Sequence, residues 1–215
     1  MKLETHLRGQ RDTGRSLLAP YITGGLGAGW LDVVRAVVDA GADAVEIGIP
    51  FSDPVMDGHT VQEASQRALE LGATPAKIVA EAAQLDVTVP LVIMTYYNVV
   101  AHAGPERFAA QLADAGVDGA IVPDLPLDEL DGWGDAAVEM GRRCKATTDM
   151  PVLLGVGIST AEQAVAAARG ADGVIVGSAL VRRVLTGGGP DEAGRYVAEL
   201  RTALDDDARD RRSRT

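Results

Sequence analysis

Short apolar runs alternate with alanine-rich segments of helical period along most of this chain. Six of the apolar runs have the length and composition of strands buried on both faces, and they cover residues 17–25, 43–50, 89–98, 118–126, 150–159 and 172–180. Segments at residues 30–41, 74–85, 104–116, 135–140 and 160–170 lie between them and are expected to be helices. Strict alternation of strand and helix predicts an α/β fold with a parallel sheet and right-handed crossovers.

An internal near-repeat supports this organisation. The segments AGADAVEIGIP, AGVDGAIVPDLP and RGADGVIVGSAL each place a helix end, a glycine, an aspartate and a strand in the same order. They begin at residues 40, 115 and 169, so the first two copies are 75 residues apart and the last two only 54. Two βα units fit generously into the first interval and tightly into the second, which makes the second half of the chain the compressed one.

Length, charge and cysteine content narrow the class of protein. A chain of 215 residues with 47% hydrophobic residues suits one globular domain, expected over residues 1–204, followed by a charged and disordered tail at residues 205–215. The net charge of −11 disfavours nucleic acid as a partner. The single cysteine, Cys144, and the polar start of the chain favour a reducing, cytoplasmic location without membrane insertion.

Two carboxylates are the candidates for acid/base chemistry. Glu46 lies inside an otherwise apolar strand, where loss of solvation raises the pKa of a carboxyl group. Asp57 follows in a loop rich in proline and glycine, where it could also serve only as a turn residue. A strand carboxylate and a loop carboxylate at one strand end form a pair whose environments can separate their pKa values.

Two glycine motifs end the last two predicted strands and predict a phosphate site. GVGIS contains Gly157, and VGSAL contains Gly177 and Ser178. Glycine at a helix N-terminus exposes backbone N–H groups to an anion, and βα barrels commonly bind phosphate at their last two strand-to-helix loops. Each motif alone could be a tight turn, but together at successive strand ends they favour phosphate binding.

The segment EIGIPFSDPVMDG carries a family resemblance, supported in order along the chain by PYITGG, TYYN, VPDLP, GVGIS and VGSAL. With these motifs the chain resembles the α subunits of tryptophan synthase as far as about Leu204. The resemblance implies a TIM (βα)8-type barrel that cleaves indole-3-glycerol phosphate into indole and glyceraldehyde 3-phosphate. It also implies no metal or organic cofactor, and a β subunit as partner in an α2β2 complex, with pyridoxal phosphate belonging to that partner.

The resemblance also assigns roles to single residues. Glu46 matches the family's general acid/base, and Asp57 matches the acid that interacts with the indole N–H. The remaining matches are substrate-pocket positions at Tyr21, Tyr96, Ile121 and Asp124, phosphate positions at Gly157, Gly177 and Ser178, and positions near the β-subunit interface at Pro50 and Asp53.

The chain departs from the family between Gly141 and Cys144. About fifty residues are absent there by comparison with the ~250 of a full barrel, which leaves about six βα units. The absent part would include the fifth and sixth strands and the lid loop that follows the sixth. Three explanations remain open: the sheet closes differently, its edges pair with another copy of the chain, or the sequence reflects an internal deletion.

Three functions are therefore weighed. The leading one is a lyase of the tryptophan synthase α type. The second is a non-catalytic chain that binds and modulates a β-subunit-like partner through the FSDPVMDG loop. The third is another phosphate-sugar barrel enzyme, against which EIGIPFSDPVMDG argues because the glycine motifs alone are shared by many such barrels.

Overall fold

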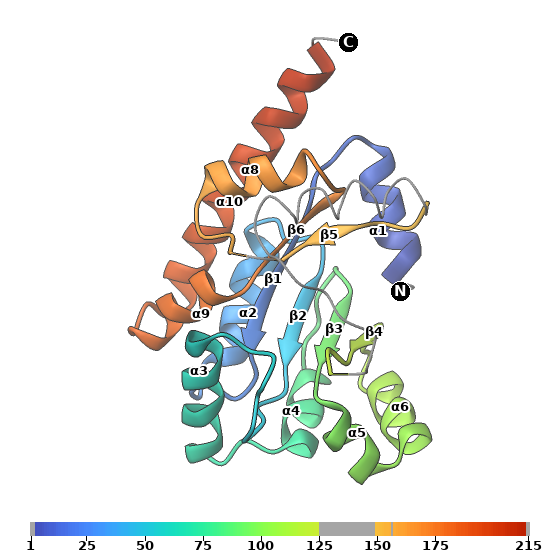
Figure 1. Ribbon diagram of the computed structural model, residues 1–215, viewed down its shortest axis with the longest axis vertical. Helices are drawn as coiled ribbons and strands as arrows, with labels where there is room; N and C mark the ends of the chain where they lie inside the picture. Colours follow the sequence, from blue (N-terminus) through green and yellow to red (C-terminus); the bar gives the residue numbers. More distant parts are fainter. Residues whose placement is uncertain (1–2, 125–148, 156, 214–215) are drawn as a thin grey trace.

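The computed structural model describes residues 3–124, 149–155 and 157–213. Its centre is a six-stranded parallel sheet in the order β4-β3-β2-β1-β6-β5, shown in Figure 1 with β1 in blue and β6 in orange. The strands are β1 (Leu17–Thr23), β2 (Val45–Gly48), β3 (Leu91–Met94), β4 (Gly119–Ile121), β5 (Leu153–Leu154) and β6 (Gly173–Val176). All six predicted strands and their parallel direction are confirmed, although each strand is shorter than the apolar run that predicted it.

Helices follow the strands, as the alternation predicted. The described helices are α1 (Leu3–Asp12), α2 (Trp30–Asp39), α3 (His59–Glu70), α4 (Pro75–Ala82), α5 (Tyr97–Ala103), α6 (Pro105–Asp114), α8 (Ala161–Ala168), α9 (Ser178–Leu185) and α10 (Gly189–Ser213). Helices α2, α4, α6 and α8 coincide with four of the predicted helical segments. The predicted helix at residues 135–140, the family departure after Gly141, and Cys144 lie outside the described residues.

The residues from Asp205 to Ser213 are helical, which differs from the disordered tail expected from their charge. Helix α10 continues through them because its apolar face continues: Leu200, Leu204 and Ala208 recur at four-residue spacing and are buried. Figure 1 shows α10 in red, running along the sheet beside α2, α8 and α9, with which it packs. The helix is hard to predict from the sequence because most of its residues here are charged. Some of these charged residues form ion pairs along the helix, such as Arg201 with Asp205 at 2.6 Å.

Alternation along the strands separates two packing faces. Leu18 and Ile22 of β1 pack under the helices, in the main core with Ile47, Ile93 and other apolar residues. The intervening residues of β1 point to the opposite face, which corresponds to the inside of a barrel, and there Tyr21 of β1 stands opposite Glu46 of β2 in the parallel register. Strand alternation therefore places the buried carboxylate on the concave side of the sheet.

Among the described residues, the sheet is of the TIM-barrel type with six strands. Strands β4 and β5 occupy the two ends of the strand order, and no pairing joins them among the residues that the structure describes. Residues of β4 are half-buried or exposed, whereas those of β1 and β2 are all buried. In the described part of the chain, no helix combines the length and the hydropathy needed to cross a membrane.

Candidate active site

A cavity of about 200 Å³ opens at the carboxyl ends of the strands. It brings together residues from β1, β2, β3 and β6 and from the loops that follow β2 and β5. Six residues predicted from the sequence line it: Tyr21, Glu46, Asp57, Gly157, Gly177 and Ser178. The two predicted carboxylates and the two glycine motifs therefore share one cavity, although they are up to about 130 residues apart in the chain.

Glu46 is the buried acid of this cavity, and its side chain belongs to a residue only 7% exposed. Burial, and to a smaller extent the negative charge of Asp57, raise the pKa of Glu46 to about 7. A carboxyl group with a pKa near 7 exchanges a proton readily at neutral pH, so it can act as a general acid and then as a general base. The sequence-based expectation of a raised pKa for Glu46 agrees with its surroundings in the fold.

Asp57 approaches the same cavity from the loop between β2 and α3. Burial raises the pKa of Asp57, while a hydrogen bond from the Tyr96 side chain lowers it. The Tyr96 hydroxyl also accepts a hydrogen bond from the Met56 backbone N–H at 3.1 Å, and its ring stacks on Phe51 with centroids 5.0 Å apart. Tyr96 therefore holds the acidic loop in place from behind the cavity instead of lining it.

A glycine in β2 makes room for Tyr21. A Cβ atom placed on Gly48 would lie 2.0 Å from the Tyr21 hydroxyl oxygen, far inside van der Waals contact. Only glycine at position 48 therefore allows the Tyr21 ring to lie over β2, next to Glu46. The sequence showed Gly48 within EIGIP but did not show which side chain needed the space, because that neighbour comes from another strand.

The phosphate-loop candidates meet the cavity at two helix starts. Helix α9 begins at Ser178 with Gly177 as its N-cap, so its first backbone N–H groups lie at the cavity wall. Gly157 has a φ of 67°, a left-handed conformation that glycine adopts without strain. Helix α8 begins two residues after Ser159 with a capping box between Thr160 and Gln163, which fixes the loop that contains Gly157.

Two contacts tie these loops to the rest of the fold. Arg182 on α9 donates a hydrogen bond to the Thr60 hydroxyl at the start of α3, which links the glycine motif at Gly177 to the helix that follows the Asp57 loop. The Tyr196 hydroxyl on α10 donates to the Ser159 carbonyl oxygen at 3.2 Å. The cavity wall is thus supported from α3 and α10 as well as from its own strands.

The other predicted site residues lie around the cavity, outside its lining. Ile121 ends β4 and is 37% exposed, and Asp124 accepts a hydrogen bond from the Tyr97 backbone N–H at 2.8 Å. Pro50 lines a separate, mostly apolar cavity of about 480 Å³ between the β2 loop and helices α4 to α6. Asp53 is exposed in the loop beside it.

Sequence reasoning assigned no individual role to eight of the lining residues: Met56, Gly58, Val61, Met94, Gly155, Ile158, Ser159 and Ile175. Gly155, Ile158 and Ser159 belong to the GVGIS motif already recognised, and Met56 and Gly58 flank Asp57. Met94 and Ile175 are apolar strand residues whose types carry no functional signal. Within residues 3–124, 149–155 and 157–213 no group of histidine, cysteine and carboxylate side chains is arranged to hold a metal ion.

Comparison with known proteins identifies the family. The sequence model of the family described as tryptophan synthase alpha chain matches residues 7–141 and 134–206. The chain belongs to the tryptophan synthase alpha chain family. Its relatives include the tryptophan synthase alpha chain of Streptomyces coelicolor, 34% identical over 245 residues that cover 89% of this chain and 90% of the relative. That of Methanosarcina mazei is 38% identical over 223 residues, covering 80% and 82%.

Solved structures of this family share the fold. Tryptophan synthase subunit alpha from Legionella pneumophila superposes with a TM-score of 0.85 at 27% identity, covering 96% of this chain and 99% of the other. Tryptophan synthase from M. tuberculosis in its aminoacrylate-bound form gives a TM-score of 0.86 at 30% identity, covering 95% and 100%. The six-stranded sheet is therefore a shortened version of the family's barrel.

The alignments also locate the shortening. The alignment with the Streptomyces coelicolor relative is 245 positions long, but it contains only 89% of the 215 residues of this chain, or about 191. About fifty positions of the relative therefore have no counterpart here. The family match divides into two segments that overlap at residues 134–141. Both observations agree with an interruption next to Gly141, where the sequence placed the absent βα units.

Proposed function

We propose that this chain cleaves indole-3-glycerol phosphate into indole and glyceraldehyde 3-phosphate, the α reaction of tryptophan biosynthesis. One observation carries the proposal: a single cavity holds a carboxyl group with a pKa of about 7, a second carboxylate, and a helix N-terminus with two glycine loops. Retro-aldol cleavage of this substrate needs a proton donor and acceptor, a partner for the indole N–H, and an anchor for phosphate. Family membership supports the same reaction.

Glu46 is proposed as the group that moves the proton. Its protonated carboxyl donates a proton to C3 of the indole ring, which turns the ring into a cationic indolenine and a good leaving group. The resulting carboxylate accepts the proton of the hydroxyl on the adjacent side-chain carbon as the C–C bond breaks. Electrons of that bond return to the ring, the hydroxyl carbon becomes the aldehyde of glyceraldehyde 3-phosphate, and Glu46 ends protonated as it began. A pKa near 7 suits both halves of this cycle.

Asp57 is proposed to bind the indole N–H. A carboxylate at this position stabilises the positive charge that develops on the ring nitrogen after C3 is protonated. Burial raises the pKa of Asp57, and the hydrogen bond from Tyr96 opposes that rise and so supports the charged form that this role requires. The contact of Tyr96 with the Met56 backbone also keeps the loop in place. Tyr21, next to Glu46 across β1 and β2, would pack against the ring, and Ile121 and Asp124 would complete the substrate pocket from the β4 end.

The phosphate group is proposed to bind between the loops at Gly157 and Gly177, against the first turn of α9. Backbone N–H groups at a helix N-terminus bind anions through hydrogen bonds and the helix dipole, and the Ser178 hydroxyl can add one more donor. The reaction as written needs no metal or organic cofactor, since every step is a proton transfer or a C–C cleavage. A β subunit is proposed as the partner, with Pro50 and Asp53 near the interface. The complex is proposed to act in the cytoplasm.

The test is an assay of indole release from indole-3-glycerol phosphate, with and without a tryptophan synthase β subunit. E46Q should abolish release, because general acid/base catalysis contributes about 10²–10⁴-fold, while substrate binding stays within a few fold. D57N should reduce turnover by a similar order, and E63Q, an exposed change on α3, is the matched control. A rate for E46Q above about a tenth of the unmodified protein's would remove Glu46 from the mechanism.

A second candidate, a catalytically impaired chain that binds and modulates a β subunit, is favoured by two observations. About fifty aligned positions of the relatives have no counterpart here. The cavity of about 200 Å³ is also smaller than the roughly 300–1,000 Å³ of ordinary small-molecule sites. The same assay separates the candidates: a chain that releases no indole yet raises β-subunit turnover is a modulator, and E46Q would then leave the stimulation unchanged.

A further inference from the structure

A larger cavity, of about 590 Å³, lies at the opposite end of the sheet from the candidate active site. It is bounded by the end of α1, the segment that enters β1, the segment between α8 and β6, and the last turns of α10. These segments meet at the amino-terminal ends of β1 and β6, whereas Gly177 and Ser178 follow the carboxyl end of β6. The cavity therefore shares no residue with the site proposed for indole-3-glycerol phosphate.

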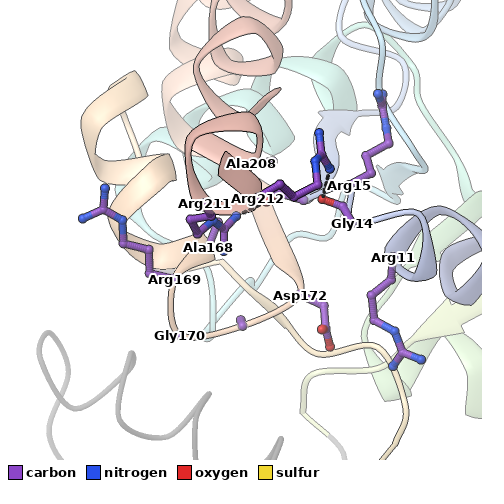
Figure 2. A pocket seen from close by; sticks show the side chains of 12 residues that line it. Arg11, Gly14, Arg15, Ala168, Arg169, Gly170, Asp172, Ala208, Arg211 and Arg212 are labelled. Carbon is purple, nitrogen blue, oxygen red and sulfur yellow. Dashed lines mark hydrogen bonds between the residues drawn. The ribbon is translucent and has the colours of Figure 1, made fainter. Parts of the chain in front are cut away.

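Arginine dominates the lining of this cavity, as Figure 2 shows. Five of its twelve residues are arginines and one is an acid, Asp172, in a chain whose net charge is −11. The arginines come from α1, the segment before β1, the C-cap of α8 and α10, and they are Arg11, Arg15, Arg169, Arg211 and Arg212. These side chains place five cationic groups around one cavity of a chain whose net charge is negative, and carboxylates outside the lining pair with several of them.

Buried carboxylates hold several of these arginines from behind the cavity wall. Asp207 accepts from Arg169 at 2.8 Å and lies 2.9 Å from Arg211, so one carboxylate serves two guanidinium groups. Asp43 accepts from Arg15 at 2.6 Å and also pairs with Arg201 at 3.2 Å. Neither carboxylate lines the cavity. The arginines are thus fixed in position before any ligand arrives, which lowers the entropy cost of binding.

Backbone and hydroxyl groups complete this arrangement. Arg212 donates to the Gly14 carbonyl oxygen at 3.2 Å, shown dashed in Figure 2, and Arg211 donates to the Ser16 hydroxyl at 2.9 Å. Gly14 has a φ of 81°, and a Cβ atom there would lie 2.8 Å from Nη1 of Arg212. Helix α10 is therefore joined at its end to the entry of β1 by two guanidinium groups that face one cavity.

We propose that this cavity binds a small molecule carrying a chain of two or more phosphate groups. A guanidinium group presents a planar set of N–H donors that matches phosphate oxygens in pairs, so several guanidiniums around one space favour a ligand with several phosphates. The volume of about 590 Å³ falls within the roughly 300–1,000 Å³ typical of small-molecule sites. Oligophosphates and nucleoside diphosphates share this chemistry, and the experiment separates the two.

The test is isothermal titration calorimetry of the full chain with sodium tripolyphosphate, pyrophosphate, ADP and adenosine at constant ionic strength. Tripolyphosphate should bind saturably, and adenosine should not bind. The double variant R211Q/R212Q should weaken tripolyphosphate binding at least tenfold, and R169Q should weaken it by a smaller factor. R195Q is the matched control, since Arg195 is also on α10, is 75% exposed and lies outside the cavity.

Two measurements keep the outcome unambiguous. Thermal unfolding of each variant, with and without tripolyphosphate, shows whether the arginines act only on stability. A purely structural role predicts a lower melting temperature in R211Q/R212Q with no tripolyphosphate-dependent rise in any protein, and that result overturns the proposal. Tighter binding of ADP than of pyrophosphate would identify a nucleotide as the ligand, and equal binding would identify a free oligophosphate.

The active-site loop is the competing location for any phosphate. G177V alters that loop and leaves the arginine cavity intact, so tripolyphosphate binding should be the same in G177V as in the unmodified chain. Loss of binding in G177V together with unchanged binding in R211Q/R212Q would place the anion at α9 and overturn the proposal. Neither result depends on indole release, so the arginine cavity is tested independently of the proposed function.

Discussion

Replacing Glu46 by glutamine should make the protein more stable at alkaline pH, and by an amount that follows from its surroundings. Burial and Asp57 raise the pKa of Glu46 from its ordinary 4.5 to about 7. The fold therefore favours the protonated form. The contribution of this group to stability is complete below its ordinary pKa and is lost as the pH rises through 7. Glutamine resembles the protonated form in shape and does not titrate.

The size of the effect follows from the shift. Each pKa unit corresponds to about 1.4 kcal/mol, so the ionised Glu46 costs the folded state about 3 kcal/mol once the pH is well above 7. At pH 5.5 the same linkage gives about 1.4 kcal/mol, so the advantage of E46Q should grow by about 2 kcal/mol between pH 5.5 and 8. Titration of Asp57 occurs in both proteins and largely cancels in the difference.

Urea unfolding of both proteins at five pH values between 5.5 and 8.5 measures this difference directly. Measurements begin at 5.5 because the sequence pI of about 4.7 favours precipitation at lower pH. E63Q, an exposed change on α3, is the control and should show no comparable growth with pH. A difference between E46Q and the unmodified protein that does not change with pH would refute a raised pKa for Glu46, and with it the argument for its acid/base role.

Three further predictions follow from the packing and the interruption. G48A should lower the free energy of unfolding by about 1–3 kcal/mol, because the new Cβ would lie 2.0 Å from the Tyr21 hydroxyl. Urea unfolding of G48A, Y21L and the double variant should give less than additive losses, because Y21L removes the side chain with which the new Cβ clashes. G177V should weaken binding of glyceraldehyde 3-phosphate at least tenfold by calorimetry, and an unchanged dissociation constant in a folded variant would place the phosphate elsewhere. Inserting the roughly fifty absent residues from a full-length relative between Gly141 and Cys144 should raise indole release and sharpen the urea unfolding transition. If the present chain already unfolds cooperatively as a fully active monomer, these residues are dispensable.

Sequence analysis alone predicted the α/β class, the positions of the six described strands and the candidates Glu46, Asp57, Gly157, Gly177 and Ser178. These features are local. A buried parallel strand needs a short apolar run, and an isolated glutamate within such a run is conspicuous without knowledge of any other residue. The interruption after Gly141 was also visible, since it is a property of motif order and spacing along the chain.

The contacts between residues that are distant in the chain became apparent only in the folded protein. Gly48 matters because Tyr21 of the neighbouring strand lies over it, and Tyr96 supports Asp57 from a third strand end. The charged residues after Asp205 form a helix where the sequence suggested a disordered tail, because Ala208 is buried and Asp207, Arg211 and Arg212 contact distant segments of the fold. The arginine cavity joins α1, the end of α8 and α10, and its arginines are up to about 200 residues apart in the chain. Such contacts depend on how the sheet twists and brings its connections together, which local composition and periodicity do not encode.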